Sequence, residues 1–168
     1  MSRLESGIFG LKPEWTDVNE LIFSVIHQFT AAKNHQIIFD ADEKLPLMRF
    51  DGVLMGQILY NLVHNAVIYT PDFSTIKLGC SLENDFSIIQ VIDDGNGFPE
   101  NEIPFVFDKF YRLPNSKTGG SGLGLSISKG YVEAHNGTIE LRNNEDRGAV
   151  FTLKIPVESS YINNLKNE

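Results

Sequence analysis

The chain has 168 residues, of which 42% are hydrophobic and 11% aromatic, and it carries a net charge of −8 at pH 7. This length is typical of a single domain, and this composition can bury a core, which excludes an intrinsically disordered chain. The acidity and the lack of a basic stripe in the sequence argue against nucleic-acid binding.

The first third of the chain is predicted to contain one helix and two short strands. Residues 1–14 form a lead-in before this helix. Asp17 is a suitable N-cap, with Glu20 at the capping-box position, and apolar residues then recur at helical spacing as far as Phe29. The two strands are expected over residues 36–39 and 45–50.

A second helix is expected to begin after Asp51, which is a suitable cap. Its apolar positions repeat every three to four residues. It must end near Tyr69, because Pro71 restricts the preceding residue and cannot continue a helix.

The rest of the chain is predicted to contain two strands, a long loop, a third helix and a final hairpin. Three helices and about six strands, mostly joined as hairpins, predict an α+β sandwich in which helices cover one sheet. A loop of more than twenty residues within a compact domain is usually functional. The expected ranges are 75–82 and 86–92 for the strands, 94–121 for the loop, 122–134 for the helix, 138–141 and 149–155 for the hairpin, and 158–168 for a polar tail.

Two asparagines lie on one face of the second helix. Asn61 and Asn65 are four residues apart, and Gln57 is one turn earlier on the same stripe. Asparagine is a poor helix former, and its amide oxygen is a neutral, hard ligand suited to Mg²⁺. A metal site is one interpretation, and a polar stripe that faces solvent is the other.

A carboxylate and two glycines follow the strand at residues 86–92. Asp93 could accept a hydrogen bond from the amine of adenine, whereas guanine presents a carbonyl there and would be rejected. Gly95 and Gly97 lack Cβ atoms and so let a flat base approach the backbone. The alternative is an ordinary turn that closes a strand.

The glycine-rich stretch at residues 119–125 leads directly into the third helix. A helix N-terminus offers free N–H groups and partial positive charge to phosphate oxygens. Upstream, Lys109, Arg112 and Lys117 could add positive charge on a mobile lid. The alternative for the glycine string is a flexible linker.

In this order, the segments resemble the catalytic ATP-binding domain of bacterial sensor histidine kinases, in the superfamily shared with gyrase B, Hsp90 and MutL. The resemblance covers residues 16–157, and the stretch 14–17 is similar to the potassium-sensing KdpD group. The matching segments are the N box at 57–71, the first glycine box at 93–97, the F box at 107–112, the second glycine box at 120–127 and the closing strand at 148–156.

The resemblance implies a fold and a set of site residues. The implied fold is a two-layer sandwich of the Bergerat type, with a mixed, mostly antiparallel sheet under three helices. Asn65 and Asn61 are expected to bind Mg²⁺ and phosphates, Asp93 to read adenine, and Arg112 to reach the phosphates from a lid at residues 98–121. Catalytic roles are expected for Asn61, Asn65 and Arg112. The full expected ATP-binding set is Asn61, Asn65, Tyr69, Asp93, Gly95, Gly97, Phe107, Lys109, Arg112, Gly120, Ser121, Gly122, Leu123, Gly124 and Leu125.

The resemblance also implies phosphate transfer from Mg·ATP to a histidine, with a cognate response regulator as the downstream partner. Hydrolytic members of the superfamily carry a glutamate at the position of Asn61, where it activates water. Asparagine cannot act as a general base, which favours transfer over hydrolysis. The alternatives are a serine kinase of the anti-sigma type, an ATPase of the same superfamily, and a degenerate nucleotide-binding scaffold.

Two departures from the family pattern qualify this interpretation. Ile68 stands where the family often has a lysine, so one phosphate contact is missing or comes from Lys109 or Lys117. No histidine of the chain lies in a phosphoacceptor box, so the acceptor is expected on a separate dimerisation domain. Residues 1–14 are then expected to be the end of the dimerisation hairpin and a linker, 15–157 the catalytic domain and 158–168 a tail.

Composition also bears on the compartment. The single cysteine, Cys80, excludes an internal disulfide framework and fits a reducing cytoplasm. No apolar run approaches the roughly 20 residues that span a bilayer, and the first residues do not resemble a secretion signal. We expect a soluble, cytoplasmic piece without direct membrane contact, from a parent protein anchored in the inner membrane.

Overall fold

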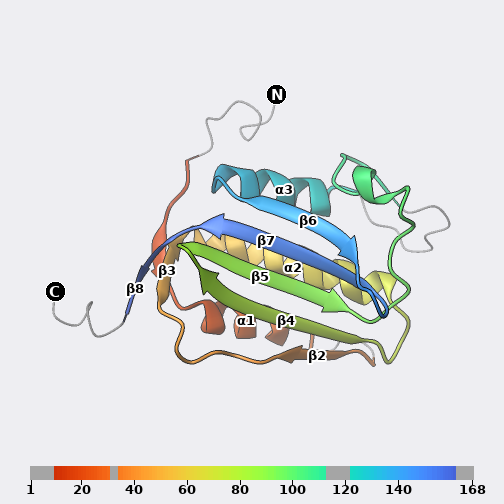
Figure 1. Cartoon of the computed structure of the whole chain (residues 1–168), viewed down its shortest axis with the longest axis horizontal. Coiled ribbons are helices and arrows are strands. Elements are labelled where there is room, and N and C mark those ends of the chain that lie inside the picture. Colours follow the sequence, from red (N-terminus) through yellow and green to blue (C-terminus); the bar gives the residue numbers. More distant parts are fainter. Residues whose placement is uncertain (1–9, 31–33, 113–121, 162–168) are drawn as a thin grey trace.

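The structure is a computed structural model that describes residues 10–30, 34–112 and 122–161. Within these residues the chain forms three α-helices, eight strands and one short 3₁₀-helix (Figure 1). In chain order these are β1 (Glu14–Thr16), α1 (Val18–His27), β2 (Gln36–Phe39), β3 (Leu47–Phe50), α2 (Gly52–Tyr69), β4 (Thr75–Glu83), β5 (Phe86–Asp93), η1 (Ile103–Phe105), α3 (Gly124–Ala134), β6 (Thr138–Asn143), β7 (Ala149–Pro156) and β8 (Glu158–Ser160).

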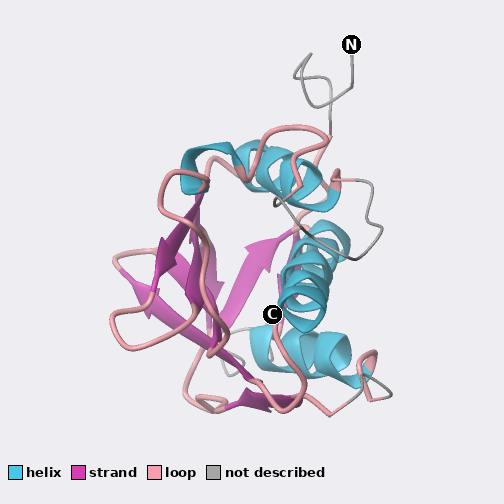
Figure 2. Ribbon diagram, turned by 90° about the vertical axis from the view of Figure 1, so that its right-hand side faces the viewer, coloured by secondary structure: helices cyan, strands magenta, loops and turns pink. Residues whose placement is uncertain are grey.

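The main sheet has five strands in the order β2-β4-β5-β7-β6. β2 and β4 are parallel, and every other neighbouring pair is antiparallel. Figure 2 shows the three helices together on one side of the strands. The predicted fold class, a mixed and mostly antiparallel sheet covered by three helices, is therefore confirmed.

Local signals in the sequence correctly located four of the six helix ends. The carboxylate of Asp17 accepts a hydrogen bond from the Glu20 N–H at 3.2 Å, and that of Asp51 accepts one from the Leu54 N–H at 3.1 Å. α2 ends at Tyr69, as Pro71 requires. Two boundaries differ: α1 ends two residues before Phe29, and α3 begins two residues after Gly122.

A second, smaller sheet was not predicted. Its strands are β1, β3 and β8 in the order β1-β3-β8, all antiparallel. β3 therefore does not join the main sheet, and residues 158–160 of the expected tail form β8. Strands of three or four residues are too short to show a clear hydrophobic period, so the expectation of one sheet was wrong on this point.

Strand β5 positions the first glycine turn. Its residues alternate between buried and partly exposed, and Ser87, Ile89, Val91 and Asp93 form the buried set. Successive side chains point to opposite faces of a sheet, so Asp93 shares the face of the apolar core with Ile89 and Val91. The core itself lies between this face and the apolar stripe of α2, which includes Leu62.

Among the described residues, no helix has both the length and the apolar character needed to cross a membrane.

Candidate functional site

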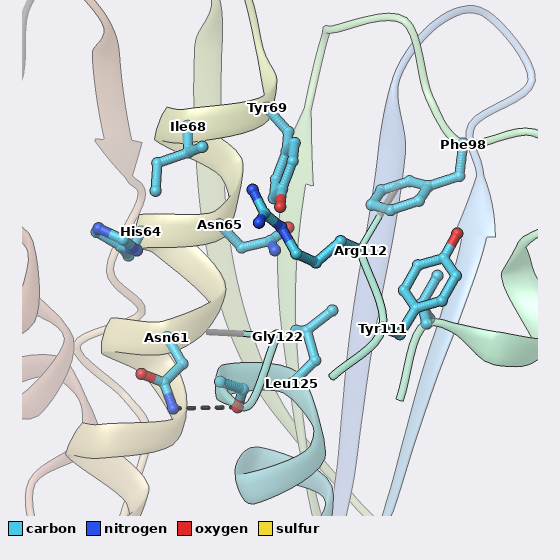
Figure 3. Close-up of a pocket in the computed structure, with 12 residues that line it drawn as sticks. Asn61, His64, Asn65, Ile68, Tyr69, Phe98, Tyr111, Arg112, Gly122 and Leu125 are labelled. Atoms are coloured by element: carbon cyan, nitrogen blue, oxygen red, sulfur yellow. Dashed lines mark hydrogen bonds between the residues drawn. The ribbon is translucent and has the colours of Figure 1, made fainter. Parts of the chain in front are cut away.

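A cavity of about 180 Å³ lies between α2, the segment around Tyr111 and the start of α3 (Figure 3). This volume is smaller than the roughly 300–1,000 Å³ that is usual for pockets that bind ligands of drug size. Side chains from the segment before residue 113 point into the space, as Figure 3 shows for Arg112. The described lining residues are Asn61, His64, Asn65, Ile68, Tyr69, Phe98, Val106, Tyr111, Arg112, Gly122, Gly124 and Leu125.

The cavity brings together seven of the predicted site residues. Asn61, Asn65 and Tyr69 come from α2, Arg112 from the segment after η1, and Gly122, Gly124 and Leu125 from the start of α3. In Figure 3 the Arg112 side chain points toward α2, whose residues Asn65 and Tyr69 line the same cavity.

Asn61 joins α2 to α3. Its Nδ2 donates hydrogen bonds to the carbonyl oxygen of Gly124 at 3.2 Å and to Oγ of Ser128 at 3.1 Å. Its Oδ1 accepts a hydrogen bond of 3.0 Å from Nε2 of Gln57, one turn earlier on α2. The carboxamide thus has partners on both sides. Asn65, four residues later, is half-buried and directs its carboxamide into the cavity (Figure 3).

Asp93 does not line this cavity but lies beyond the Tyr69 end of α2. Its side chain is 7% exposed, and Oδ1 accepts hydrogen bonds from the N–H groups of Gly95 at 2.9 Å and Ala149 at 3.2 Å. Burial raises the pKa of the carboxyl; these two hydrogen bonds oppose the rise, and the charge of Asp94 adds to it.

The glycines after Asp93 are required by close packing. A Cβ on Gly95 would lie 2.7 Å from Cγ2 of Thr70, the residue that follows α2. A Cβ on Gly97, whose φ is +74°, would lie 2.6 Å from Oδ1 of Asn143. The first contact brings the turn after Asp93 against Thr70, which directly follows the cavity-lining Tyr69 at the end of α2.

Three residues of the β6–β7 hairpin support this turn, and no sequence motif indicated such a role for them. Asn143 accepts a hydrogen bond from the Phe98 N–H at 2.8 Å and donates one to the Phe98 carbonyl at 2.7 Å. Nε of Arg147 donates to the carbonyl of Gly95 at 3.1 Å. Gly148 has a φ of +91°, and a Cβ there would collide with the backbone carbonyl of Asp93.

The expected lid is described only in part, since residues 113–121, including Gly120, Ser121 and Lys117, lie outside the described range. The two described ends meet, because the Phe110 N–H donates to the Gly122 carbonyl at 3.0 Å. Gly122 has a φ of +75°, and a Cβ there would lie 2.6 Å from the carbonyl carbon of Phe110.

Two predicted residues of the F box are not in the cavity lining. The ring of Phe107 packs edge-on against Phe151 at 6.2 Å between centroids, so it anchors the segment to the core. Lys109 is exposed. Tyr111 does line the cavity, and its hydroxyl donates to the Glu102 carboxylate at 2.6 Å. Burial and this neighbouring carboxylate raise the pKa of Tyr111, so the phenol stays protonated.

The start of α3 presents backbone to the cavity. Leu123 occupies the N-cap position without a side-chain capping hydrogen bond, and Gly124 and Leu125 line the cavity. The first N–H groups of a helix have no partner within the helix, and they carry partial positive charge. Ile68 also lines the cavity, so an apolar side chain stands where a lysine was expected from the family pattern.

Comparisons with known proteins agree with this architecture. The family described as histidine kinase-, DNA gyrase B- and HSP90-like ATPase matches residues 50–159. The sensor protein KdpD of Escherichia coli (strain K12) is 34% identical over 95% of the chain, and the sensor histidine kinase WalK of Bacillus subtilis (strain 168) is 29% identical over 93%. The chain spans only 18% of that KdpD and 27% of that WalK.

Solved structures show the same fold. The catalytic domain of the histidine kinase ThkA superposes with a TM-score of 0.74 at 29% identity, covering 86% of this chain and 97% of that domain. Full-length ShkA in complex with AMPPNP superposes with a TM-score of 0.84 over 95% of this chain and 34% of ShkA. At 24% identity, ShkA supports the fold alone.

The family match covers well over half of the chain. The chain therefore belongs to the histidine kinase-, DNA gyrase B- and HSP90-like ATPase family.

Proposed function

We propose that the chain is the catalytic domain of a sensor histidine kinase, which binds Mg·ATP and donates the γ-phosphate to a histidine on a separate dimerisation domain. The observation that carries this proposal is the convergence of Asn65, Arg112 and the start of α3 on one cavity, at the end of α2 against which the turn after Asp93 packs. A response regulator is the proposed downstream partner, and the cytoplasm the proposed compartment of the domain.

Asp93 is the proposed adenine reader. Oδ1 is occupied by two backbone N–H groups, so within the described part of the chain Oδ2 is the oxygen left for the adenine amine. A hydrogen bond to a charged group contributes about 1.5–3 kcal/mol. Because the carboxylate is already held in place, little side-chain entropy is lost on binding.

The phosphates are proposed to lie between Arg112 and the N–H groups at the start of α3. The donors fit Mg²⁺, because Asn65 offers a neutral amide oxygen and Mg²⁺ usually takes one or two protein ligands together with phosphate oxygens. When bound, the ion would neutralise charge on the phosphates. Oδ1 of Asn61 already accepts a hydrogen bond from Gln57, so Asn65 is the stronger candidate for the ion.

The cavity favours transfer over hydrolysis. Its described lining contains no aspartate or glutamate that could activate water. His64 is the one histidine of that lining; its ring is stacked 5.7 Å from that of Tyr60, and in Figure 3 it points away from Arg112. Catalysis of phosphoryl transfer then relies on positioning and electrostatics.

A calorimetric titration with ATP and GTP, each with and without Mg²⁺, tests the binding proposal. We expect ATP to bind selectively and more tightly with Mg²⁺; no binding of either nucleotide would favour the scaffold alternative that Ile68 suggests. Incubation with a dimerisation domain and labelled ATP tests transfer. An acid-labile phosphohistidine supports the histidine kinase, whereas an acid-stable phosphoserine or rapid phosphate release supports the other enzymes of the superfamily.

A further inference from the structure

The interface between α2 and α3 contains a buried hydroxyl to which the proposed function gives no role. Ser128, in the second turn of α3, is 0% exposed. Burying a hydroxyl costs free energy unless it is hydrogen-bonded. Its Oγ accepts the hydrogen bond of 3.1 Å from Nδ2 of Asn61, so this hydroxyl is directly linked to a residue of the nucleotide cavity.

The partners of Asn61 determine how its carboxamide is oriented. The Gly124 carbonyl oxygen can only accept a hydrogen bond, so the Asn61 atom that faces it at 3.2 Å must be Nδ2. Nδ2 donates one of its hydrogens to Gly124 and the other to Ser128, so both of its hydrogens are engaged. Oδ1 is consequently turned toward Gln57, along α2.

These bonds connect the two elements that the phosphate end of the site needs. Gly124 begins α3, whose first N–H groups are the proposed phosphate donors, and Ser128 lies one turn further on. Asn65, the proposed magnesium ligand, lies one turn from Asn61 on α2. The position of the phosphate donors relative to the magnesium ligand therefore depends on how Asn61 holds α3.

We infer that Ser128 is a positioning residue for the phosphate end of the site, and that it acts through Asn61. In this arrangement the Asn61 carboxamide sets the position of α3 against α2, and Asn65 is the residue that meets the metal. The inference rests on the proposed function. It predicts that the Ser128 hydroxyl influences the binding of Mg·ATP but not the binding of adenosine, which has no phosphates.

The test compares Ser128→Ala with the matched control Ser87→Ala. Ser87 is also buried, at 1% exposure, but it lies in β5 and contacts Sγ of Cys80 at 3.8 Å instead of a cavity residue. Losing one hydrogen bond should weaken Mg·ATP binding by roughly three- to tenfold in Ser128→Ala. Adenosine affinity should be unchanged, as should both affinities in Ser87→Ala. Equal losses for adenosine and Mg·ATP would overturn the inference, because they would indicate general loosening of the domain.

A double-mutant cycle tests whether Ser128 acts through Asn61. In an Asn61→Ala background, Ser128→Ala should have no further effect on Mg·ATP affinity. An undiminished effect there would contradict the inference, since the hydroxyl would then act by another route.

A second readout does not depend on nucleotide. The side-chain amide protons of Asn61, followed by NMR, should shift and exchange faster with solvent in Ser128→Ala but not in Ser87→Ala. Unchanged Asn61 signals in Ser128→Ala would overturn the inference even if Mg·ATP binding were weakened. If the unmodified protein binds no nucleotide, the proposed function fails, and the Asn61 signals still decide whether Ser128 holds this side chain.

Discussion

The adenine end and the phosphate end of the proposed site are built in different ways. At the adenine end, the turn after β5 is held from the β6–β7 hairpin by Asn143, Arg147 and Gly148, and Oδ1 of Asp93 is held by two N–H groups. These contacts join parts of the main sheet that are themselves paired along their length. The carboxylate that we propose reads the base is therefore held in place without a ligand.

The phosphate end is assembled from separate elements. Arg112 comes from the segment after η1, the phosphate donors from α3, and Asn65 from α2. One backbone hydrogen bond, from Phe110 to Gly122, joins the two described ends of the lid. In the proposed site, the base-reading end is therefore part of the paired sheet, whereas the phosphate end takes its residues from three separate elements.

The largest expected effect is at the adenine end. Gly148→Ala would force a Cβ into the Asp93 carbonyl and would place a non-glycine residue at a φ of +91°. We expect a loss of roughly 2–4 kcal/mol in the free energy of unfolding, measured by denaturant titration. Gly79→Ala in β4 is the control. A Cβ there meets nothing within 4 Å, so the free energy of unfolding should not change. Equal effects of the two changes would refute the view that the turn is rigidly packed.

Asp93→Asn should separate binding from stability. The oxygen of the introduced amide could still accept from Gly95 and Ala149, but the amide nitrogen would then face the adenine amine, donor against donor. We expect ATP affinity to fall by roughly 10- to 100-fold, with no loss of stability at neutral pH because no charge is buried. Calorimetry and denaturation measure the two effects. Asp94→Asn, at the exposed neighbour, should leave ATP affinity within about twofold.

Gly122→Ala should reduce Mg·ATP affinity more than stability, in contrast to Gly148→Ala, for which we expect a loss of stability. A Cβ would press on the Phe110 backbone and break the contact between the lid ends. Because Phe110 is exposed and lies outside the apolar core, we expect unfolding free energy to change by less than about 1 kcal/mol while Mg·ATP affinity falls roughly tenfold. Gly56→Ala on α2, where a Cβ meets only ordinary contact at 3.5 Å, is the control for both measurements. A large loss of stability would show that the lid base belongs to the rigid scaffold.

The smallest expected effect is the change with pH in the contribution of Asp93 to the free energy of unfolding. Its folded pKa is raised above 3.8, so the protonated form is favoured in the folded state. Its stabilising contribution is complete below pH 3.8 and is lost as the pH rises through the folded pKa. The unliganded protein should therefore lose stability relative to Asp93→Asn across this acidic window, while adenine affinity increases as the carboxylate ionises. A difference in unfolding free energy that does not vary with pH would contradict the assignment.

The sequence alone determined the elements that depend on local chemistry. Asp17 and Asp51 are caps because their oxygens reach N–H groups three residues away, and Pro71 stops α2 by its own ring geometry. The pairing of Asn61 with Asn65 on one helical face follows from four-residue spacing. The order of the N box, the first glycine box, the F box and the second glycine box was also readable, and it predicted the family.

Only the tertiary structure decided which distant residues meet. Asn143 holds Phe98 across 45 positions, Ala149 donates to Asp93 across 56, and Asn61 reaches Ser128 across 67. No local period or propensity encodes such contacts, because they exist only once the strands have paired and α3 has packed on α2. For the same reason β1, β3 and β8 could not be predicted as one sheet: each is too short to stabilise itself, and its partners come from both ends of the chain.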